Sequence, residues 1–360
     1  MENIFNEIVK ALERKEKLAL ATIINRVGSA PREAGAKYLV KKDGKAIGSI
    51  GGGCVEADVW QEARKTMEKE EGSVLHFKLT SEQLAEGGLI CGGNIDIFLE
   101  PIREDSLNIY REVLKVRQQG GAGILATVIS VDGTSPKREG VKAFIKASGE
   151  KTGSLFMGEE LEGRILKEAE RLLRVKKIEV MTVVSSAETA HPWKTLEILL
   201  EPIFSEPTVY IFGAGHISQQ LVPLVKKVHF KTVVIDDREM FANRDRFPEA
   251  DEIMVSDFEK SFEQITIDNS SYIVIVTRGH LYDGLILEMA VKTDAHYIGM
   301  IGSKKKVQTL YQFLLKKGIP KEALDKVHAP IGLDIHSETP EEIAVSIVAQ
   351  LIMERRGKMA

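Results

Sequence analysis

The stretch TVYIFGAGHISQQLVPLVKKVHFKTVVIDDRE, residues 208–239, decides the fold of the second half of the chain. It reads as an apolar strand, a glycine loop, a helix and a second apolar strand that ends in two carboxylates. Gly213 is expected to make the tight turn and Gly215 to let a pyrophosphate approach the backbone. Ser218 takes the third motif position, and Asp236 follows at the distance at which such motifs place a carboxylate. The spacing predicts a Rossmann unit.

The rest of the chain continues this alternation, which predicts a doubly wound parallel sheet over residues 208–360. Polar residues stand where strands end, on the edge at which such sheets bind ligands. The candidate nucleotide-binding residues are Gly213, Gly215, His216, Ser218, Asp236, Asp237, Arg278, Gly279 and Ser303. Because Asp236 and Asp237 end a strand where a carboxylate accepts from a ribose 2′-hydroxyl, they favour NAD or another adenine nucleotide without a 2′-phosphate. The alternative is a Rossmann fold whose site is empty or vestigial.

Two local patterns concern the helices of this half. Pro223 interrupts the first helix and is expected to kink it. Thr339, Pro340 and Glu342 have the spacing of a capping box with proline in the first helical position, so they predict the start of the last helix.

The first 203 residues contain an internal repeat. Residues 20–53 match residues 125–158 without a gap, so that Lys37 pairs with Lys142 and Gly48 with Gly153. Each copy closes on Leu-Glu-Pro-Ile, at residues 99–102 and 200–203. We expect two related α+β modules, about residues 16–102 and 121–203, that pack as a pseudo-dimer in one domain spanning residues 1–203. The stretch PIFSEP, residues 202–207, is the expected linker.

The two cysteines each lie against glycines, in GSIGGGCVE (48–56) and GGLICGGNIDIF (87–98). The second copy has no equivalent of either, and Glu159 stands opposite Cys54. Since the same scaffold forms without them, these residues are expected to serve a ligand rather than the fold. Glycines before a helix N-terminus open backbone N–H groups to an anion, and that helix end stabilises a thiolate. The candidate cofactor-binding residues are Gly51, Gly52, Gly53, Cys54, Cys91, Gly92, Gly93 and Arg32.

Each of these assignments has an alternative. The cysteines can be small buried apolar residues, and Arg32 can be ordinary surface charge, because its counterpart Lys137 is also basic. Glu56 is the one possible catalytic residue, since it can orient a group or take a proton, but it can equally serve the helix dipole. Thiolates suit either a soft metal or sulfur transfer, and in the first case Cys54 and Cys91 are the candidate metal ligands.

The composition of the chain excludes several classes of protein. The chain is 43% hydrophobic and 28% charged, with a net charge of -4, which is ordinary for a soluble globular protein. There is no basic surplus that would indicate nucleic acid and no apolar run long enough for a membrane span. Two cysteines cannot ligate an iron–sulfur cluster, and the eight histidines are scattered, so no zinc site is predicted. We expect a cytoplasmic protein that binds neither nucleic acid nor a membrane.

Together the motifs GSAPREAGAK, GSIGGGCVE, CGG, FGAGHIS, DDR, TRGHLYD, YIGMIGSKKK and IGLDIHSETPEEIAVSI resemble the xanthine dehydrogenase accessory factor family (XdhC/CoxI-like). The resemblance extends from about residue 16 to 352. It implies a homodimeric chaperone that binds the molybdenum cofactor (molybdopterin), assists its sulfuration by a cysteine desulfurase and inserts it into a xanthine dehydrogenase-type molybdenum hydroxylase. Carried over, Cys54 and Cys91 with the neighbouring glycines would form the pterin–molybdenum site. The readable second copy departs from the single marked copy of the family pattern.

Two other functions remain open at this point. The Rossmann unit is compatible with an NAD-dependent oxidoreductase, although no pair of residues suited to hydride transfer is evident. It is also compatible with a nucleotide-sensing regulator in which the second half controls the cysteine half. An accessory chaperone accounts for more of the sequence than a catalyst does, because soft ligands and anion-binding loops are present without an acid–base array.

Overall fold

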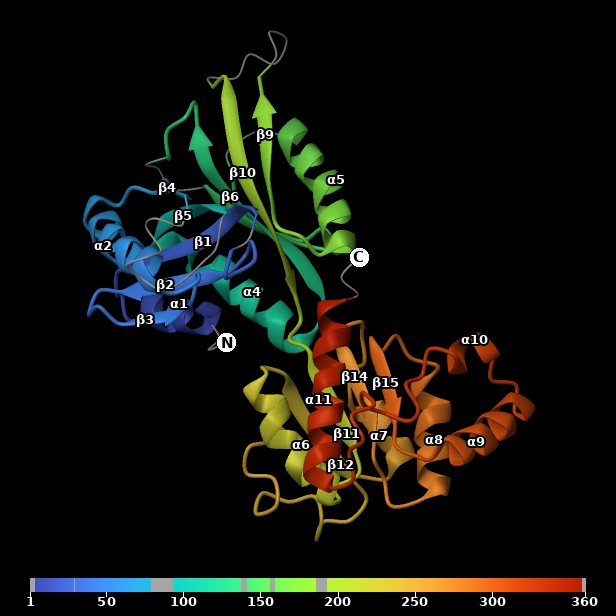
Figure 1. Cartoon of the computed structure of the whole chain (residues 1–360). Helices are drawn as coiled ribbons and strands as arrows, with labels where there is room; N and C mark the ends of the chain where they lie inside the picture. Colours follow the sequence, from blue (N-terminus) through green and yellow to red (C-terminus); the bar gives the residue numbers. More distant parts are fainter. Residues whose placement is uncertain are drawn as a thin grey trace. The chain divides into compact units, whose positions relative to one another are not determined.

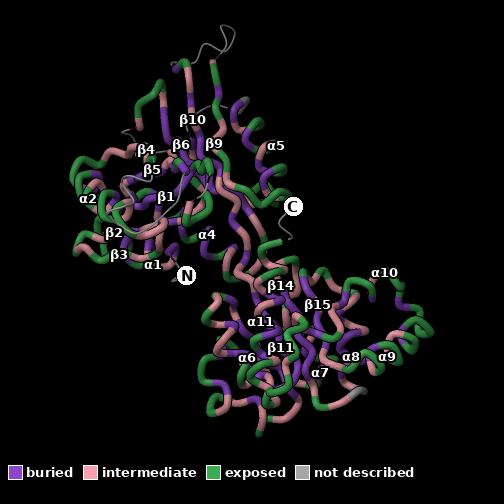
Figure 2. Tube along the Cα trace, in the orientation of Figure 1, coloured by how far each residue is buried: buried purple, intermediate pink, exposed green. Residues whose placement is uncertain are grey.

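The structure is a computed structural model of the whole chain, and it describes residues 4–28, 30–78, 93–136, 141–155, 159–185 and 193–357. The chain forms two compact units, Met1–Ser205 and Glu206–Ala360 (Figure 1). Each unit has its own buried core, drawn in purple in Figure 2. Within the described ranges, no helix is both long and apolar enough to cross a bilayer.

The first unit contains two antiparallel five-stranded sheets of the same design. Their strand orders, β3-β2-β1-β5-β4 and β8-β7-β6-β10-β9, are equivalent strand by strand. The first module consists of α1 (Ile4–Glu13), β1 (Leu18–Val27), β2 (Lys37–Lys41), β3 (Ala46–Gly48), α2 (Gly53–Lys69), β4 (Ser73–Lys78) and β5 (Asn94–Ile102). The second consists of η1 (Glu104–Ser106), α4 (Leu107–Gln119), β6 (Ala122–Val131), β7 (Lys142–Lys146), β8 (Lys151–Ser154), α5 (Glu159–Val175), β9 (Glu179–Val184) and β10 (Thr195–Phe204). The predicted duplication of an α+β module is confirmed.

Each sheet of the first unit is covered on both faces. Helix α2 packs on the outer face of the first sheet through Val59 and Ala63, and α5 packs on the second sheet through Ile165 and Leu172. The inner faces meet each other, and α1 and α4 join their shared core. This arrangement explains why the first seven residues of β1 are all buried, since a strand covered on both faces needs apolar residues at successive positions.

Two buried ion pairs join the modules reciprocally, and we call them the exchanged ion pairs. Lys37 of the first module lies 2.7 Å (Nζ–Oε2) from Glu201 of the second, and Lys142 of the second lies 3.0 Å (Nζ–Oε1) from Glu100 of the first. All four side chains are at most 13% exposed. Each ammonium also donates to a buried hydroxyl of its own module, on Thr22 or Thr127. The two modules therefore complete each other's buried charges.

The second unit is a five-stranded parallel sheet in the order β13-β12-β11-β14-β15. Its elements are β11 (Thr208–Phe212), α6 (His216–Lys227), β12 (Lys231–Asp236), β13 (Glu252–Val255), α7 (Phe258–Gln264), β14 (Ser271–Ile275), α8 (His280–Ala290), β15 (Tyr297–Met300), α9 (Lys304–Lys316), α10 (Lys321–Leu324) and α11 (Pro340–Arg356). The second unit begins with its central strand, β11, and the strand order reverses between β11 and β14, so the ligand crevice of such folds is expected at that point. The Rossmann prediction is confirmed.

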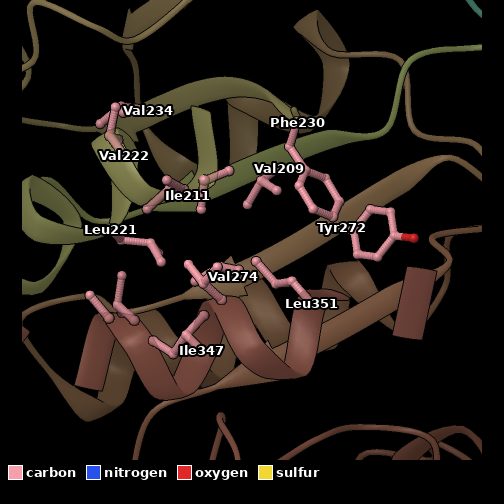
Figure 3. Packing of buried hydrophobic residues seen from close by; sticks show 14 of the residues in the cluster. Val209, Ile211, Leu221, Val222, Phe230, Val234, Tyr272, Val274, Ile347 and Leu351 are labelled. Carbon is pink, nitrogen blue, oxygen red and sulfur yellow. The ribbon is translucent and has the colours of Figure 1, made fainter. Parts of the chain in front are cut away.

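Helices cover both faces of this sheet. On one face, Leu221 of α6 and Ile347 and Leu351 of α11 pack against Val209 and Val274 of the central strands (Figure 3). Residues of α7, α8 and α9 form the core on the other face. Because the sheet is buried on both faces, its central strand β11 and the neighbouring β14 are buried at every position.

The local helix predictions have different outcomes. The capping box is confirmed, because the Thr339 side chain accepts from the backbone N–H of Glu342 and the Glu342 carboxylate accepts from that of Thr339. Pro223 lies inside α6, and the helix continues past it to Lys227. A kink at this proline stays a prediction.

Candidate functional site

The end of the loop before α2 and the first residue of that helix are three consecutive glycines with positive φ angles. Their φ angles are 130° at Gly51, 79° at Gly52 and 62° at Gly53, values that residues with a Cβ rarely adopt. A Cβ on Gly51 would lie 3.2 Å from Cγ of Pro31, whereas one on Gly52 would have no atom within 4 Å. The loop thus leaves open space beside its backbone at Gly52.

Cys54 lies in the first turn of α2 and is exposed. The N-cap is Gly52, which has no side chain with which to cap the first N–H groups of the helix. These groups carry the positive end of the helix dipole, which stabilises a thiolate or a bound anion. We call residues 49–56 the cysteine loop.

Glu56 holds the shape of this loop. Its Oε1 accepts hydrogen bonds from the Ser49 hydroxyl (2.8 Å), the Ile50 N–H (3.0 Å) and the Gly52 N–H (2.8 Å). Burial raises the pKa of the nearby Tyr38, and the negative charge of Glu56 raises it further. The structure therefore gives Glu56 a positioning role, and the suggested catalytic role stays untested. Ser49, which donates to Glu56, was not among the predicted site residues, and its counterpart in the second copy is also a serine, Ser154.

Several strands of the first sheet begin or end on the same side of the sheet, which we call its edge: β1 and β3 end there, and β2 and β5 begin there. The end of β1 at Val27 lies opposite Asn94 at the start of β5, and the end of β3 at Gly48 lies opposite Tyr38 near the start of β2. The cysteine loop, which follows β3, and the buried Gly93, which precedes β5, therefore emerge from the same edge.

The other candidates of the first unit have different positions. Arg32 is exposed in the loop between β1 and β2, which starts from the same edge as the cysteine loop. Cys91 and Gly92 lie outside the described residues, so the predicted meeting of Cys54 with Cys91 stays a prediction.

In the second unit, the two motif glycines differ in what they do. Gly213 has a φ of 110°, and a Cβ there would lie 2.5 Å from the carbonyl oxygen of Val276. Gly215 has an ordinary extended conformation (φ −80°) and no atom within 4 Å of a hypothetical Cβ. Gly213 is therefore required by the fold, whereas Gly215 leaves space at the N-terminus of α6.

Ser218 occupies the third motif position and is fully buried. Its hydroxyl donates to the carbonyl oxygen of Gly213 at 2.5 Å, which ties the glycine loop to the first turn of α6. Ser218 is therefore a positioning residue that has no surface to offer a ligand. His216, the first residue of α6, is exposed beside the loop.

The Asp236 carboxylate, predicted to accept from a ribose, is only 1% exposed and already has partners. Its Oδ2 accepts from the N–H of Ala214 (2.8 Å), and Arg238 donates through Nε to Oδ1 (2.8 Å) and through Nη2 to Oδ2 (3.1 Å). Burial raises the pKa of Asp236, but the hydrogen bonds from Arg238 and Ala214 outweigh it, so the pKa lies below its usual value. Asp236 thus connects the end of β12 to the glycine loop, and its carboxylate is also bound by Arg238.

Asp237 also has an arginine partner. Arg278, which follows β14, binds it in a bidentate geometry, with Nη1–Oδ1 at 2.7 Å and Nη2–Oδ2 at 2.8 Å. This contact joins the ends of β12 and β14, the two strands that flank β11. Arg238 was not among the predicted site residues, although it is the last residue of the motif DDR, two positions after Asp236.

A third group at this edge was also missed from the sequence. Asp283 is fully buried and lies 2.5 Å (Oδ1–Oγ1) from Thr277 and 2.6 Å (Oδ2–Nζ) from Lys306. Ser303 caps α9 by accepting from the N–H of Lys306, and Gly279 is the N-cap of α8. Their positions at strand ends were predicted, but the buried carboxylate that connects them was not.

The lowered pKa of Asp236 predicts a specific pH dependence. The ionised carboxylate contributes fully above its unfolded-state pKa, near 3.9, and the contribution is lost as pH falls through the lower folded-state pKa. Asp236→Asn should lower the free energy of unfolding of the second unit by about 2 kcal/mol at pH 7, because charge-assisted hydrogen bonds are replaced by neutral ones. Calorimetry of the full chain at several pH values measures the effect.

The control is Asp257→Asn. Asp257 pairs with Lys260 on the surface, and both side chains are about 70% exposed, so the change should have little effect. The difference between wild type and Asp236→Asn should shrink below about pH 4, because the carboxylate then takes up a proton in the unfolded chain before it does so in the folded protein. An equal difference at pH 3 and pH 7 would show that the charge of Asp236 is not what stabilises this edge.

The sequence matches two family models along most of its length. Residues 209–351 match the XdhC Rossmann domain, and residues 11–78 and 116–184 each match the XdhC and CoxI family. The second model thus matches the chain twice, once in each module.

Similar proteins cover the whole chain or parts of it. A probable xanthine dehydrogenase subunit from Bacillus subtilis (strain 168) is 28% identical over 358 residues, which span 99% of this chain and 98% of that protein. The "Molybdenum cofactor insertion chaperone PaoD" of Escherichia coli (strain K12) is 33% identical over 95 residues, 26% of this chain and 30% of that protein. A crystal structure from Bacillus halodurans, described as a xanthine dehydrogenase, superposes with a TM-score of 0.77 at 28% identity and covers 98% of this chain and 96% of that one. With its repeated module and its Rossmann unit both matched, the chain belongs to the XdhC and CoxI family.

Proposed function

We propose that the protein is an accessory factor of a xanthine dehydrogenase-type molybdenum hydroxylase, which binds the molybdenum cofactor as its cargo. The observation that carries the proposal is the cysteine loop: an exposed thiol in the first turn of a helix, beside three glycines with positive φ angles. The partial match to a molybdenum cofactor insertion chaperone supports the same cargo.

The chemistry of the loop suits this cargo. The first N–H groups of α2 are donors for the phosphate of a pterin cofactor, and a thiolate is a suitable ligand for molybdenum. Glu56 fixes the loop before the cargo arrives, which lowers the entropy cost of binding. In the proposal, Cys91 approaches Cys54 from the segment before Gly93, and Arg32 adds positive charge at the same edge.

The proposal includes two finer steps and one assembly. The bound cofactor is held while a cysteine desulfurase supplies sulfur, and it then passes to the hydroxylase apoenzyme. The acting species is a homodimer in the cytoplasm. We further propose that the second unit binds an adenine dinucleotide at the edge formed by Gly213, Gly215 and Arg278, because Gly215 leaves its backbone open to a pyrophosphate.

The test of the cargo uses protein purified from a host that makes the molybdenum cofactor. Wild-type protein should contain pterin and molybdenum in near-equal amounts. Cys54→Ala should lose about nine tenths of both, since even changes in groups that support a metal ligand weaken metal binding about 10–100-fold. Molybdenum is measured by mass spectrometry and pterin by the fluorescence of its oxidised form. Cys91→Ala, measured in parallel, tests the second thiol.

Asp58→Asn is the matched control, because Asp58 is an exposed residue one turn further along α2. It should retain both molybdenum and pterin. Cofactor in neither the wild type nor the variants, with the protein folded, would refute the proposed cargo. Full cofactor in Cys54→Ala would refute the assigned site while leaving the cargo in place.

A further inference from the structure

We infer that the second unit recognises an adenine dinucleotide that carries a 2′-phosphate, such as NADPH, through the guanidinium groups of Arg238 and Arg278. The inference rests on the proposed nucleotide binding and reverses the preference expected from Asp236. It assigns a ligand class and two specificity residues to the ribose end of the site.

The first step of the argument is that Asp236 cannot serve as a free ribose acceptor. Both of its oxygens already accept hydrogen bonds, from the N–H of Ala214 and from Arg238, and the residue is 1% exposed. A ribose hydroxyl would have to displace Arg238 to reach it. The preference for an unphosphorylated ribose depends on an exposed carboxylate, and this site has none at that position.

The second step is that the cations face outward from this cluster. The side chains of Arg238 and Arg278 are 28% and 37% exposed, whereas those of Asp236 and Asp237 are 1% and 20% exposed. The four groups are close enough to act together, because Nη1 of Arg278 lies 3.9 Å from Oδ1 of Asp236 and Nε of Arg238 lies 3.7 Å from Oδ1 of Asp237. At the end of β12 the two arginine side chains are therefore more exposed to a ligand than the two carboxylates that they bind.

The third step is that both arginines are fixed in place with donors to spare. Arg238 lies over the ring of Phe241 at 3.8 Å from guanidinium carbon to centroid, and Arg278 lies over that of Tyr282 at 4.7 Å. Arg238 binds Asp236 through Nε and Nη2, so its Nη1 still has N–H groups to donate. Arg278 uses Nη1 and Nη2, which leaves its Nε. Pre-positioned planar donors of this kind suit a phosphate.

The location agrees with the fold. The end of β12 is where Rossmann units place the ribose next to adenine, and an arginine near it accommodates a 2′-phosphate. The aromatic rings beneath the arginines hold the guanidinium planes without using their donors. Arg238 and Arg278 therefore have two roles in the inference: they neutralise the carboxylates of Asp236 and Asp237, and they bind the 2′-phosphate.

The experiment measures binding of NADPH and NADH to the full-length protein through the fluorescence of the reduced nicotinamide. NADPH should bind at least about tenfold more tightly, the effect of one charge-assisted contact, and the preference should weaken as ionic strength rises. Competition by 2′,5′-ADP should exceed competition by 5′-AMP by a similar factor, which locates the preference at the 2′-phosphate.

Arg278→Met is the main variant, because it removes an exposed guanidinium and leaves an accessible carboxylate behind. It should reduce the preference for NADPH to less than about threefold, which is below the effect of one charged contact. Arg238→Met is made together with Asp236→Asn, so that no buried charge is left unpaired. Arg244→Met is the control, since Arg244 binds the carbonyl oxygens of Ala250 and Asp251 and should leave the preference unchanged.

The outcomes separate the two proposals. If neither nucleotide binds, both nucleotide binding and the inference fail. If NADH binds as tightly as NADPH or more tightly, the second unit binds dinucleotides but the inference is wrong. A preference for NADPH that survives in both the Arg278 variant and the Arg238 double variant also overturns the assignment to these residues.

Discussion

Replacing Lys37 by methionine should lower the free energy of unfolding of the first unit by about 3–5 kcal/mol, because it leaves the buried carboxylate of Glu201 without its partner. The two side chains are 8% and 13% exposed, so water cannot replace the lost ammonium without opening the interface between the modules. Both tryptophans of the chain, Trp60 and Trp193, lie in the first unit. Urea unfolding followed by tryptophan fluorescence therefore reports on this unit directly.

Two further variants serve as controls for the Lys37→Met measurement. The double variant Lys37→Met with Glu201→Met should recover most of the loss, since a buried ion pair replaced by apolar side chains is often neutral in stability. Lys17→Met removes a surface ion pair whose side chains are 53% and 58% exposed, and it should cost less than about 1 kcal/mol. If Lys37→Met costs no more than Lys17→Met, the exchanged ion pairs do not hold the modules together.

Gly213→Ala should destabilise the second unit by about 3 kcal/mol or more. The change forces a side chain into a left-handed conformation, which costs about 1–3 kcal/mol, and it places Cβ 2.5 Å from the carbonyl oxygen of Val276, which adds a cost of overpacking. Calorimetry of the full-length protein measures the loss, and binding of NADPH should disappear with it because the glycine loop moves.

Gly215→Ala is the matched comparison within the same motif. Its backbone is extended, and no atom lies within 4 Å of the added Cβ, so the stability should change by less than about 0.5 kcal/mol. The added methyl group nevertheless occupies space at the N-terminus of α6 where the pyrophosphate is expected, so nucleotide binding should weaken while folding stays intact. Equal destabilisation by the two alanines would contradict the separate roles assigned to these glycines.

Much of the architecture could be predicted because it depends on local patterns. The alternation of apolar strands and helices identified the parallel sheet, and the match between residues 20–53 and 125–158 identified the duplicated module. The capping box at Thr339 was predictable because its two partners are three residues apart. These features depend on spacing along the chain, which the sequence contains in full.

The partners of individual charges could not be predicted in this way. The repeat aligned Lys37 with Lys142 and Glu100 with Glu201, but only the packed sheets show that each lysine binds the glutamate of the other module. Asp236 was expected to serve a ribose because its place in the motif was correct. Which group neutralises a buried carboxylate depends on three-dimensional contacts, here with Ala214 and Arg238. Motif spacing therefore located the edge of the site but not its electrostatics.

The exchanged ion pairs also have a consequence for synthesis on the ribosome. Glu201 follows Lys37 by 164 residues, and at about 5–20 residues per second roughly 10–30 s pass before the partner of this lysine has been made. During that interval the first module can form its sheet and bury α2 on its outer face, but its inner face has neither the second sheet nor a counter-charge. The inner face of the nascent first module therefore stays exposed until the second module has been synthesised.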